Sequence, residues 1–439
     1  MKLRNTLIFI IGIIITFALL WFLLPSIAEP FLNFSILLLL SIYVWSAIKV
    51  RVRKQVPILR AIFVVLFWLP MVLVGVSSIA LLNFSLDDWP PFLKVYFIGG
   101  LFTYIVSLLL PIVFLFIADI VKWIEMLFKK QNVNRTDNIK GNEVTRRKFI
   151  VNTGLSLGGI ALGTMGFGMI HGNYNFKIWR HQLKVSRASQ ALKGLRIVQI
   201  SDFHLGTWVS KAPLEEAVKY INDLQADLVF FTGDLVNSKT EEAFPFKEEL
   251  SKVKAKYGVY ASLGNHDYGH YHRWADEAEQ QKNWDDLMEF YENIGWKLLR
   301  NQTETLEIQG RKVNVIGVEN WSKNPRFPRL GDLDLAIESN PNAELNLLLS
   351  HDPTHWSEKV ILTKAPIDIT FSGHTHGFQF GIESSLFRWS PAQYIYKHWA
   401  GIYQNEESEI YLNVNRGIGA IGFPGRVGIK PEITLVEIA

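Results

Sequence analysis

Five short polar motifs in the second half of the sequence contain the residues best suited to bind metal ions. They read D-F-H, G-D, G-N-H-D, H-D and G-H-T-H, beginning at residues 202, 233, 264, 351 and 373. Carboxylate, imidazole and amide ligands without thiolate favour Mn, Fe or Zn. The ligand-type side chains are Asp202, His204, Asp234, Asn265, His351, His374 and His376. They are too many for one ion, so the sequence predicts two divalent ions that share a bridging carboxylate.

Each motif alone is a weak signal, because Asp and Asn are also common in ordinary turns. The five motifs together are hard to explain as turns, since each offers metal ligands and most contain glycine. Glycine lets the backbone pass close to a cluster of ions. We therefore expect the glycines of the motifs to lie against the ligands. They are Gly233, Gly264, Gly373 and Gly377.

The motifs follow short apolar runs that are typical of buried strands. Strands are predicted at 195–200, 227–232, 258–263, 312–318, 345–350, 367–372, 410–414 and 433–438. Helices are predicted at 213–224, 246–256 and 274–294. This alternation predicts a layered α/β domain. Ligands of such domains bind at the carboxyl ends of the strands, where the motifs would converge.

The order of the five motifs resembles that of the calcineurin-like metallophosphoesterases, from about Leu195 to the C-terminus. The resemblance implies a four-layer α/β/β/α sandwich. It assigns one ion to Asp202, His204, Asp234 and His376. It assigns the other ion to Asp234, Asn265, His351 and His374. The bridging carboxylate would be that of Asp234.

Within this family the sequence most resembles a membrane-associated bacterial branch. Some members of that branch follow a twin-arginine-type segment, and some relatives cleave the pyrophosphate of UDP-diacylglucosamine. Phe378 departs from the pattern, because the branch often has a second glycine after G-H-T-H-G. This side chain is expected to narrow the mouth of the site.

Two cations about 3.5–4 Å apart lower the pKa of a water molecule held between them, and the resulting hydroxide attacks phosphorus. His266 is the predicted proton donor to the leaving group, with Asp267 as the residue that orients it. Arg416 is predicted either to contact phosphate or to form a structural salt bridge. The predicted activity is metal-dependent hydrolysis of a phosphodiester, phosphomonoester or pyrophosphate. The alternative is a catalytically silent sensor or scaffold, against which the intact ligand set argues.

The first 170 residues are rich in long apolar segments that are typical of transmembrane helices. Five such segments are predicted at 7–24, 31–48, 61–86, 95–118 and 149–170. The sequence thus divides into a four-helix transmembrane region (1–122), a basic loop (123–148), a fifth transmembrane helix (149–170) and a metallophosphoesterase domain (171–439).

Basic residues alternate from loop to loop along this region. The segments before residue 7, between 49 and 60, and between 122 and 148 are rich in Lys and Arg, whereas the intervening loops are not. The positive-inside rule then places the basic loops in the cytoplasm and the C-terminal domain outside it. The predicted location is a bacterial inner membrane. Arg146 and Arg147 are interpreted either as a twin-arginine export signal or as a simple basic anchor.

Composition excludes several other classes of function. The chain of 439 residues contains no cysteine, so disulfides, thiolate metal sites and cysteine nucleophiles are excluded. The net charge is only +4, and the basic residues gather beside the apolar segments, so no nucleic-acid partner is expected. The expected partners are the lipid bilayer and a phosphate-containing small molecule or lipid-linked substrate.

Overall fold

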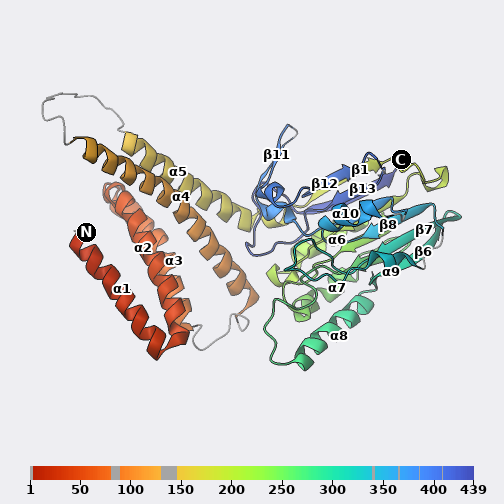
Figure 1. Ribbon diagram of the computed structural model, residues 1–439, viewed down its shortest axis with the longest axis horizontal. Helices are drawn as coiled ribbons and strands as arrows, with labels where there is room; N and C mark the ends of the chain where they lie inside the picture. The colour runs from red at the N-terminus through yellow and green to blue at the C-terminus, as the bar shows by residue number, and fades with distance from the viewer. Residues whose placement is uncertain are drawn as a thin grey trace. The chain divides into compact units, whose positions relative to one another are not determined.

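The computed structural model describes residues 3–80, 89–129, 146–338, 342–363, 366–384, 386–407 and 409–439. The chain forms two compact units, Met1–Gly166 and Phe167–Ala439, each of which is treated separately below (Figure 1). The end of the predicted third apolar segment and most of the predicted basic loop lie outside the described residues.

In the residues described, the N-terminal unit consists of helices and short turns. Its helices are α1 (Leu3–Leu23), α2 (Pro25–Arg53), α3 (Pro57–Ala80), α4 (Pro91–Lys129) and α5 (Arg146–Ile170), the last of which ends in the second unit. Four of them, α2 to α5, are long and apolar enough to cross a membrane, among the residues described. The apolar part of α1 found in the same search, Ile11–Leu23, is shorter, so the first predicted span stays a prediction.

Polar contacts inside this unit connect helices that are distant in sequence. The Tyr43 hydroxyl of α2 donates to the Asp119 carboxylate of α4 at 2.7 Å. Arg147, in the first turn of α5, pairs with the same carboxylate at 3.0 Å. Asp119 of α4 therefore accepts from two other helices, α2 and α5.

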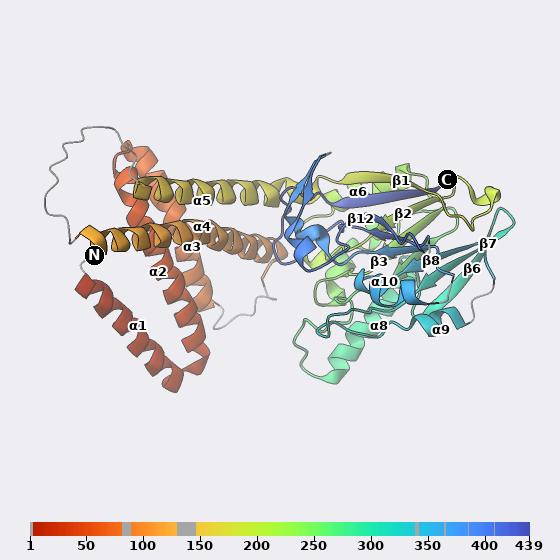
Figure 2. The same cartoon turned by 45° about the horizontal axis from the view of Figure 1, so that its top comes forward.

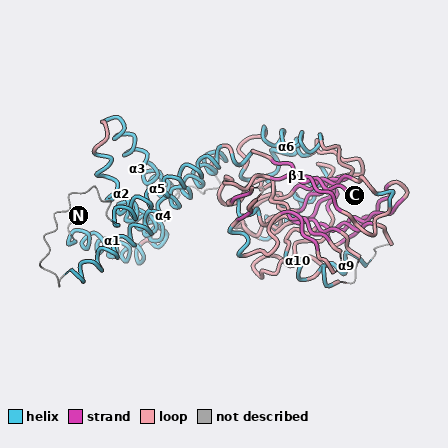
Figure 3. Tube along the Cα trace, turned by 90° about the horizontal axis from the view of Figure 1, so that it is seen from above, coloured by secondary structure: helices cyan, strands magenta, loops and turns pink. Residues whose placement is uncertain are grey.

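The C-terminal unit contains two six-stranded sheets, drawn in magenta in Figure 3. The first sheet has the order β1 (Lys177–Leu183), β14 (Glu432–Ile438), β2 (Arg196–Ile200), β3 (Leu228–Thr232), β4 (Val259–Ser262) and β5 (Lys297–Leu298). The second has the order β12 (Gly401–Gln404), β13 (Tyr411–Val414), β9 (Ile369–Ser372), β8 (Leu345–Leu349), β7 (Arg311–Gly317) and β6 (Gln302–Ile308). A separate hairpin joins β10 (Ile382–Glu383) to β11 (Arg388–Trp389).

The central strands are apolar on both faces because both faces are buried. In β3, Leu228 and Phe230 pack between the two sheets, against residues such as Phe371 of β9. The alternate residues, Val229 and Phe231, face the outer helices. This period of two follows from the pleat of a strand.

Helices cover the outer face of each sheet. The first sheet is covered by α6 (Ala212–Asp223), α7 (Lys247–Leu250) and α8 (Glu277–Asn293). The second is covered by α9 (Leu333–Glu338) and α10 (Thr354–Glu358). The result is the predicted four-layer α/β/β/α sandwich, whose layers are also visible in Figure 2.

One predicted helix is much shorter than expected. The sequence pattern predicts a helix at 246–256, but α7 spans only Lys247–Leu250. The backbone N–H groups of Lys254 and Lys256 donate to Asn222 and to the Ala226 carbonyl, outside any helix. These bonds turn the chain toward β4, so tertiary contacts override the local helical pattern.

Candidate metal centre

The five motifs lie where the sequence predicts, directly after the carboxyl ends of five strands. The strands are β2, β3 and β4 of the first sheet and β8 and β9 of the second. Three overlapping groups of side chains have ligand atoms within 4.8 Å of one another. These groups are Asp202–His204–His376, His204–Asp234–His266 and Asp234–His351–His374. Because the groups share members, they form one continuous centre.

The backbone of the motifs is unusual at the ligand-type residues. Asp202, His204, Asp234, His374 and His376 all have positive φ, between 48° and 73°. Left-handed backbone is uncommon for residues other than glycine, although Asp and His adopt it more often than most. Such conformations persist where the surrounding structure enforces them, and they cluster at functional sites. Here they turn the side chains toward a common point.

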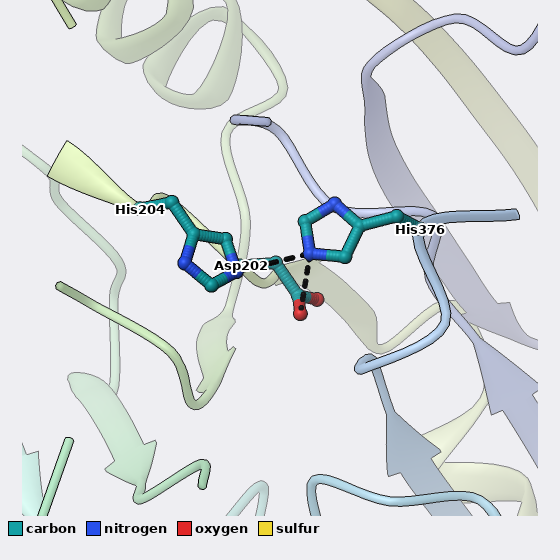
Figure 4. A group of neighbouring side chains, drawn as sticks. All are labelled: Asp202, His204 and His376. Carbon is teal, nitrogen blue, oxygen red and sulfur yellow. Dashed lines mark hydrogen bonds and ion pairs between the residues drawn. The ribbon is translucent and has the colours of Figure 1, made fainter. Parts of the chain in front are cut away.

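Figure 4 shows the first group, in which the side chains of Asp202, His204 and His376 point toward one another. The Nε2 atoms of His204 and His376 are 3.0 Å apart. His376 Nε2 lies 3.3 Å from Asp202 Oδ1. Asp202 and His204 have no exposed surface, and His376 is also buried.

Asp234 lies at the junction of the other two groups. Its Oδ2 atom is 3.5 Å from His204 Nε2 and 3.1 Å from His351 Nε2. Its Oδ1 atom accepts a hydrogen bond from the backbone N–H of His266 at 2.9 Å. One carboxylate oxygen thus faces a histidine of each neighbouring group, which is the geometry of a bridging ligand.

The third group extends from Asp234 toward Asp352. His351 Nε2 and His374 Nδ1 are 3.2 Å apart. His374 Nε2 lies 3.4 Å from Asp352 Oδ2 and 3.0 Å from the Tyr396 hydroxyl. Sequence analysis did not assign roles to Asp352 or Tyr396. Asp352 directly follows a ligand-type histidine, which was the available signal, whereas Tyr396 is brought in by a loop that carries no motif.

Asn265 is buried, and its Nδ2 atom donates to the Tyr271 hydroxyl at 2.9 Å. Its Oδ1 atom is also buried and has no hydrogen-bond partner among the described residues. A buried polar atom without a partner is costly and calls for an explanation. A metal ion provides one, because an amide oxygen is a suitable ligand.

Burial and charge set the protonation of these groups. Burial lowers the pKa of His204 well below its usual value and keeps the ring neutral, which is the form that binds metals. Burial alone would raise the pKa of Asp234. The charges of His351 and the neighbouring histidines outweigh this effect and hold the pKa well below its usual value. The Asp234 carboxylate is therefore ionised and buried, and a buried anion needs compensating cations.

Contacts behind the ligands orient their rings. His351 Nδ1 faces the Thr232 carbonyl at 2.7 Å, and His266 Nδ1 faces the Asn237 carbonyl at 2.6 Å. Because a carbonyl only accepts, both Nδ1 atoms carry the proton and both Nε2 atoms are free in the neutral ring. Contacts of this kind are typical of metal-binding histidines.

The role predicted for Asp267 needs correction. Asp267 does not orient His266; its carboxylate instead accepts the backbone N–H groups of Asp234, Leu235 and Gly264. It therefore fixes the loops that carry the ligands.

Arg416 forms a structural salt bridge, the second of the two roles that the sequence allows for it. It is 1% exposed, and it forms ion pairs with Glu432 and with Glu383, the latter at 2.5 Å. A guanidinium held by two carboxylates inside the protein is not available to a phosphate group.

A second buried arginine was not predicted. The Arg426 guanidinium donates to the Arg416, Gly417 and Gly419 carbonyls and lies 3.4 Å from His376 Nδ1. It holds the loop of residues 416–419 against the first ligand group, Asp202–His204–His376. No pattern in the sequence distinguishes it from other arginines.

Two motif glycines are required by the closeness of the ligands. A Cβ atom at Gly264 would collide with the Asp234 carboxylate, and one at Gly373 would collide with Asp202 and the Ser201 hydroxyl. The expectation that motif glycines lie against the ligands holds at these two positions, whereas Gly233 lies against the Gly264 backbone and Gly377 against Ile429 and Trp399.

A buried centre of two carboxylates, four histidines and one amide, on the strand ends of an α/β/β/α sandwich, defines a metal-dependent hydrolase of phosphoric esters. Residues 195–378 match the family of Calcineurin-like phosphoesterases. Residues 26–173 match the family described as Probable Calcineurin-like phosphoesterase, transmembrane domain. The chain thus contains a calcineurin-like phosphoesterase domain and a transmembrane domain of the kind found in such phosphoesterases.

Several known proteins are similar to this chain. It is 26% identical to the "Transmembrane protein with metallophosphoesterase domain" of Danio rerio, over 93% of this chain and 88% of that one. It is 27% identical to the metallophosphoesterase YkuE of Bacillus subtilis, over 67% of this chain and 98% of that one. It is 28% identical to the UDP-2,3-diacylglucosamine pyrophosphatase LpxG of Chlamydia muridarum, over 55% and 83%. Among solved structures, TT1561 of Thermus thermophilus matches 51% of this chain and 90% of its own, at 12% identity and a TM-score of 0.33.

Proposed function

We propose that this protein hydrolyses a phosphodiester or pyrophosphate with two divalent ions held at the described centre. One ion is assigned to Asp202, His204, Asp234 and His376, and the other to Asp234, Asn265, His351 and His374. The observation that carries the proposal is the position of Asp234, whose Oδ2 atom lies within 3.5 Å of histidines from both groups. The donor set suits Mn, Fe or Zn.

Ions bound here supply an activated water molecule and offset the charge that develops on the phosphoryl oxygens. The protein contributes a rigid set of ligands and a proton donor. His266 Nδ1 donates to the Asn237 carbonyl, so its Nε2 atom is the one directed to other partners. In its protonated form, Nε2 donates a proton to the leaving oxygen.

We propose further that the catalytic unit lies outside the cytoplasm. The support is the positive-inside rule, applied to the basic segment between α4 and α5. This conclusion does not depend on whether α1 spans the membrane, because only the loop before the last span decides the side on which the chain emerges. The membrane itself is proposed to be a bacterial inner membrane, although relatives occur in both bacteria and animals.

The substrate is proposed to be lipid-linked. One relative is a pyrophosphatase of UDP-2,3-diacylglucosamine, and a substrate with acyl chains is available to an enzyme that is anchored in the same bilayer. Against the silent-scaffold alternative, all seven ligand-type residues are present in the sequence, and the two carboxylates and four histidines among them lie in the three groups of the centre.

The proposal is tested with the purified full chain, stripped with a chelator and reloaded with Mn²⁺, Fe²⁺ or Zn²⁺. Three soluble probes separate the bond types: methyl 4-nitrophenyl phosphate, 4-nitrophenyl phosphate and UDP-N-acetylglucosamine. We expect hydrolysis of the diester or the pyrophosphate only after metal is restored. Absence of turnover of all three probes by metal-loaded protein would contradict the proposal.

A further inference from the structure

One surface of the C-terminal unit exposes large apolar side chains instead of burying them. After residue 170, twelve large apolar side chains are exposed among the residues described, and seven of these lie between 378 and 395. They are Phe378, Phe380, Ile382, Leu386, Phe387, Tyr394 and Ile395, referred to below as the apolar hairpin surface. Leu386 is 96% exposed and Tyr394 is 75% exposed. A concentration of this kind marks a contact with a partner or a membrane.

The apolar hairpin surface is an ordered part of the fold. Ile382 of β10 pairs with Trp389 of β11, whose ring packs against Phe380 with centroids 6.4 Å apart. Trp389 Nε1 also donates to the Tyr394 hydroxyl at 3.3 Å. Figure 1 and Figure 2 show β11 projecting away from the two sheets. The apolar side chains thus lie on a projecting hairpin, which is held together by contacts among its own residues.

The base of the hairpin is bonded to residues that contact the end of α5. The backbone N–H of Arg426 donates to the Gly168 carbonyl, in the last turn of α5, at 3.2 Å. The next residue, Val427, donates to the Gln379 carbonyl at 2.7 Å and accepts from Gly381 at 2.9 Å. Because α5 is a candidate membrane span, its last turn marks a membrane surface. The hairpin therefore begins close to that surface.

The polar groups of the hairpin suit a lipid interface. Its acidic residue, Glu383, is ion-paired with Arg416 at 2.5 Å. Two exposed cations, Arg388 and Lys397, flank the apolar side chains and can contact anionic headgroups. Trp389 and Tyr394 are the residue types that concentrate at membrane interfaces.

Residues 378–395, which carry the apolar hairpin surface, adjoin the metal centre at both of their ends. Phe378 follows the ligand-type residue His376 by two positions. At the other end, Tyr396 follows Ile395 and contacts His374 Nε2 with its hydroxyl at 3.0 Å. A molecule held at the apolar hairpin surface would thus have its polar end near the ligands.

We propose that the apolar hairpin surface enters the interfacial layer of the bilayer and delivers membrane-borne amphiphilic phosphates to the metal centre. The proposed delivery of substrate rests on the proposed hydrolase function. The proposed membrane contact does not. The bilayer is the occupant that the observations favour, because the surface is tied to the end of a membrane helix and lacks a free acidic group among its described residues. Contact with lipid would also explain why the aliphatic and aromatic side chains project outward.

The membrane contact is tested by fluorescence in the full chain. Since the natural sequence contains no cysteine, Leu386→Cys provides a single attachment site for an NBD fluorophore. The matched control is Leu362→Cys, at another exposed leucine outside the surface, which is 74% exposed. Both proteins are reconstituted in phosphatidylcholine–phosphatidylglycerol nanodiscs, with or without doxyl-labelled lipid.

We expect a blue-shifted NBD emission at position 386 that doxyl lipid quenches, and neither effect at position 362. An unshifted emission at 386 would overturn the membrane contact. A blue shift without quenching by doxyl lipid would also overturn it, because a protein partner or a second copy would then cover the surface.

The delivery of amphiphilic substrates is tested with two diesters that share a leaving group. Hexadecyl 4-nitrophenyl phosphate is carried in the nanodisc, and methyl 4-nitrophenyl phosphate is supplied in solution. For Leu386→Asp combined with Phe387→Asp, the ratio of lipid-borne to soluble turnover should fall by about tenfold or more, as burying apolar side chains contributes at least that factor. Leu362→Asp should leave the ratio unchanged.

An unchanged ratio in the double variant would overturn the delivery role. If metal-loaded natural protein hydrolyses neither diester nor the pyrophosphate UDP-N-acetylglucosamine, the proposed function fails, whereas the fluorescence result still decides the membrane contact. The two proposals are thus separable.

Discussion

At the scale of single residues, each ligand-type side chain is positioned by the strand that precedes it. Strand ends of one sheet meet at a shared edge, so sequence order was sufficient to group Asp202, Asp234 and Asn265. The orienting role predicted for Asp267 was wrong, and the sequence left the role of Arg416 open between two alternatives. Both are decided by partners elsewhere in the chain: backbone N–H groups of the ligand loops for Asp267, and two carboxylates for Arg416.

Asn265 and His266 are neighbours with different proposed roles. His266→Ala should keep both ions but lose turnover, because a general acid acts only as the leaving-group bond breaks. The loss should be about 10²–10⁴-fold for alkyl leaving groups and small for nitrophenyl esters, which need little protonation. Steady-state rates with both ester types, together with metal analysis, provide the measurement.

The control for this prediction is His270→Ala, an exposed histidine four positions further along the chain. It should affect neither metal content nor rate. Loss of metal from His266→Ala, or equal slowing of both ester types, would exclude His266 as the acid.

At the scale of elements, the buried strands were predictable and the edge strands were not. Strands such as β3 and β8 are apolar at every position but one, Thr232 and Asn346 respectively, and every residue in them is buried. The missed strands β1 and β6 lie at sheet edges and contain charged or polar residues at most positions. Such sequences resemble loops until a neighbouring strand supplies the hydrogen bonds. The hairpin of β10 and β11 was missed for the same reason.

The loop after β4 is expected to control metal affinity through its glycine. Gly264→Ala should lower the metal content, because the added Cβ would displace the Asp234 carboxylate. Metal content and thermal unfolding are measured together. The control is Gly310→Ala, which has positive φ but no atom within 4 Å of the added Cβ.

An alanine at the positive φ of Gly310 costs about 1–2 kcal/mol of backbone strain. The control should therefore lose about that much stability and keep its normal metal content. Equal metal content in the two variants would contradict the assigned role of Gly264.

At the scale of the whole molecule, the central expectation is that the C-terminal unit lies outside the cytoplasm. An alkaline phosphatase reporter fused after residue 439 should be active in a bacterial host, and a fluorescent protein that folds only in the cytoplasm should be dark. The opposite pattern would contradict the positive-inside assignment of the segment before α5.

The same fusions distinguish the two interpretations of Arg146 and Arg147. Replacing both with Lys preserves the positive charge and can preserve the ion pair between position 147 and Asp119, which is 3.0 Å in the natural protein. Export should then be normal if α5 is a simple anchor. Loss of export would identify a twin-arginine signal, because the charge and the pairing residue are retained.

The account depends most directly on a pair of ions bridged by Asp234, and the decisive measurement is elemental analysis of the purified, metal-loaded full chain. The natural protein should hold about two divalent ions per chain, as two-metal hydrolases do. Asp234→Asn should lose most of both ions and its turnover, because the bridge serves both. Asp223→Asn, at an exposed aspartate of α6, should behave like the natural protein. A natural protein that holds no ion, or an Asp234→Asn variant that retains two, would contradict the account.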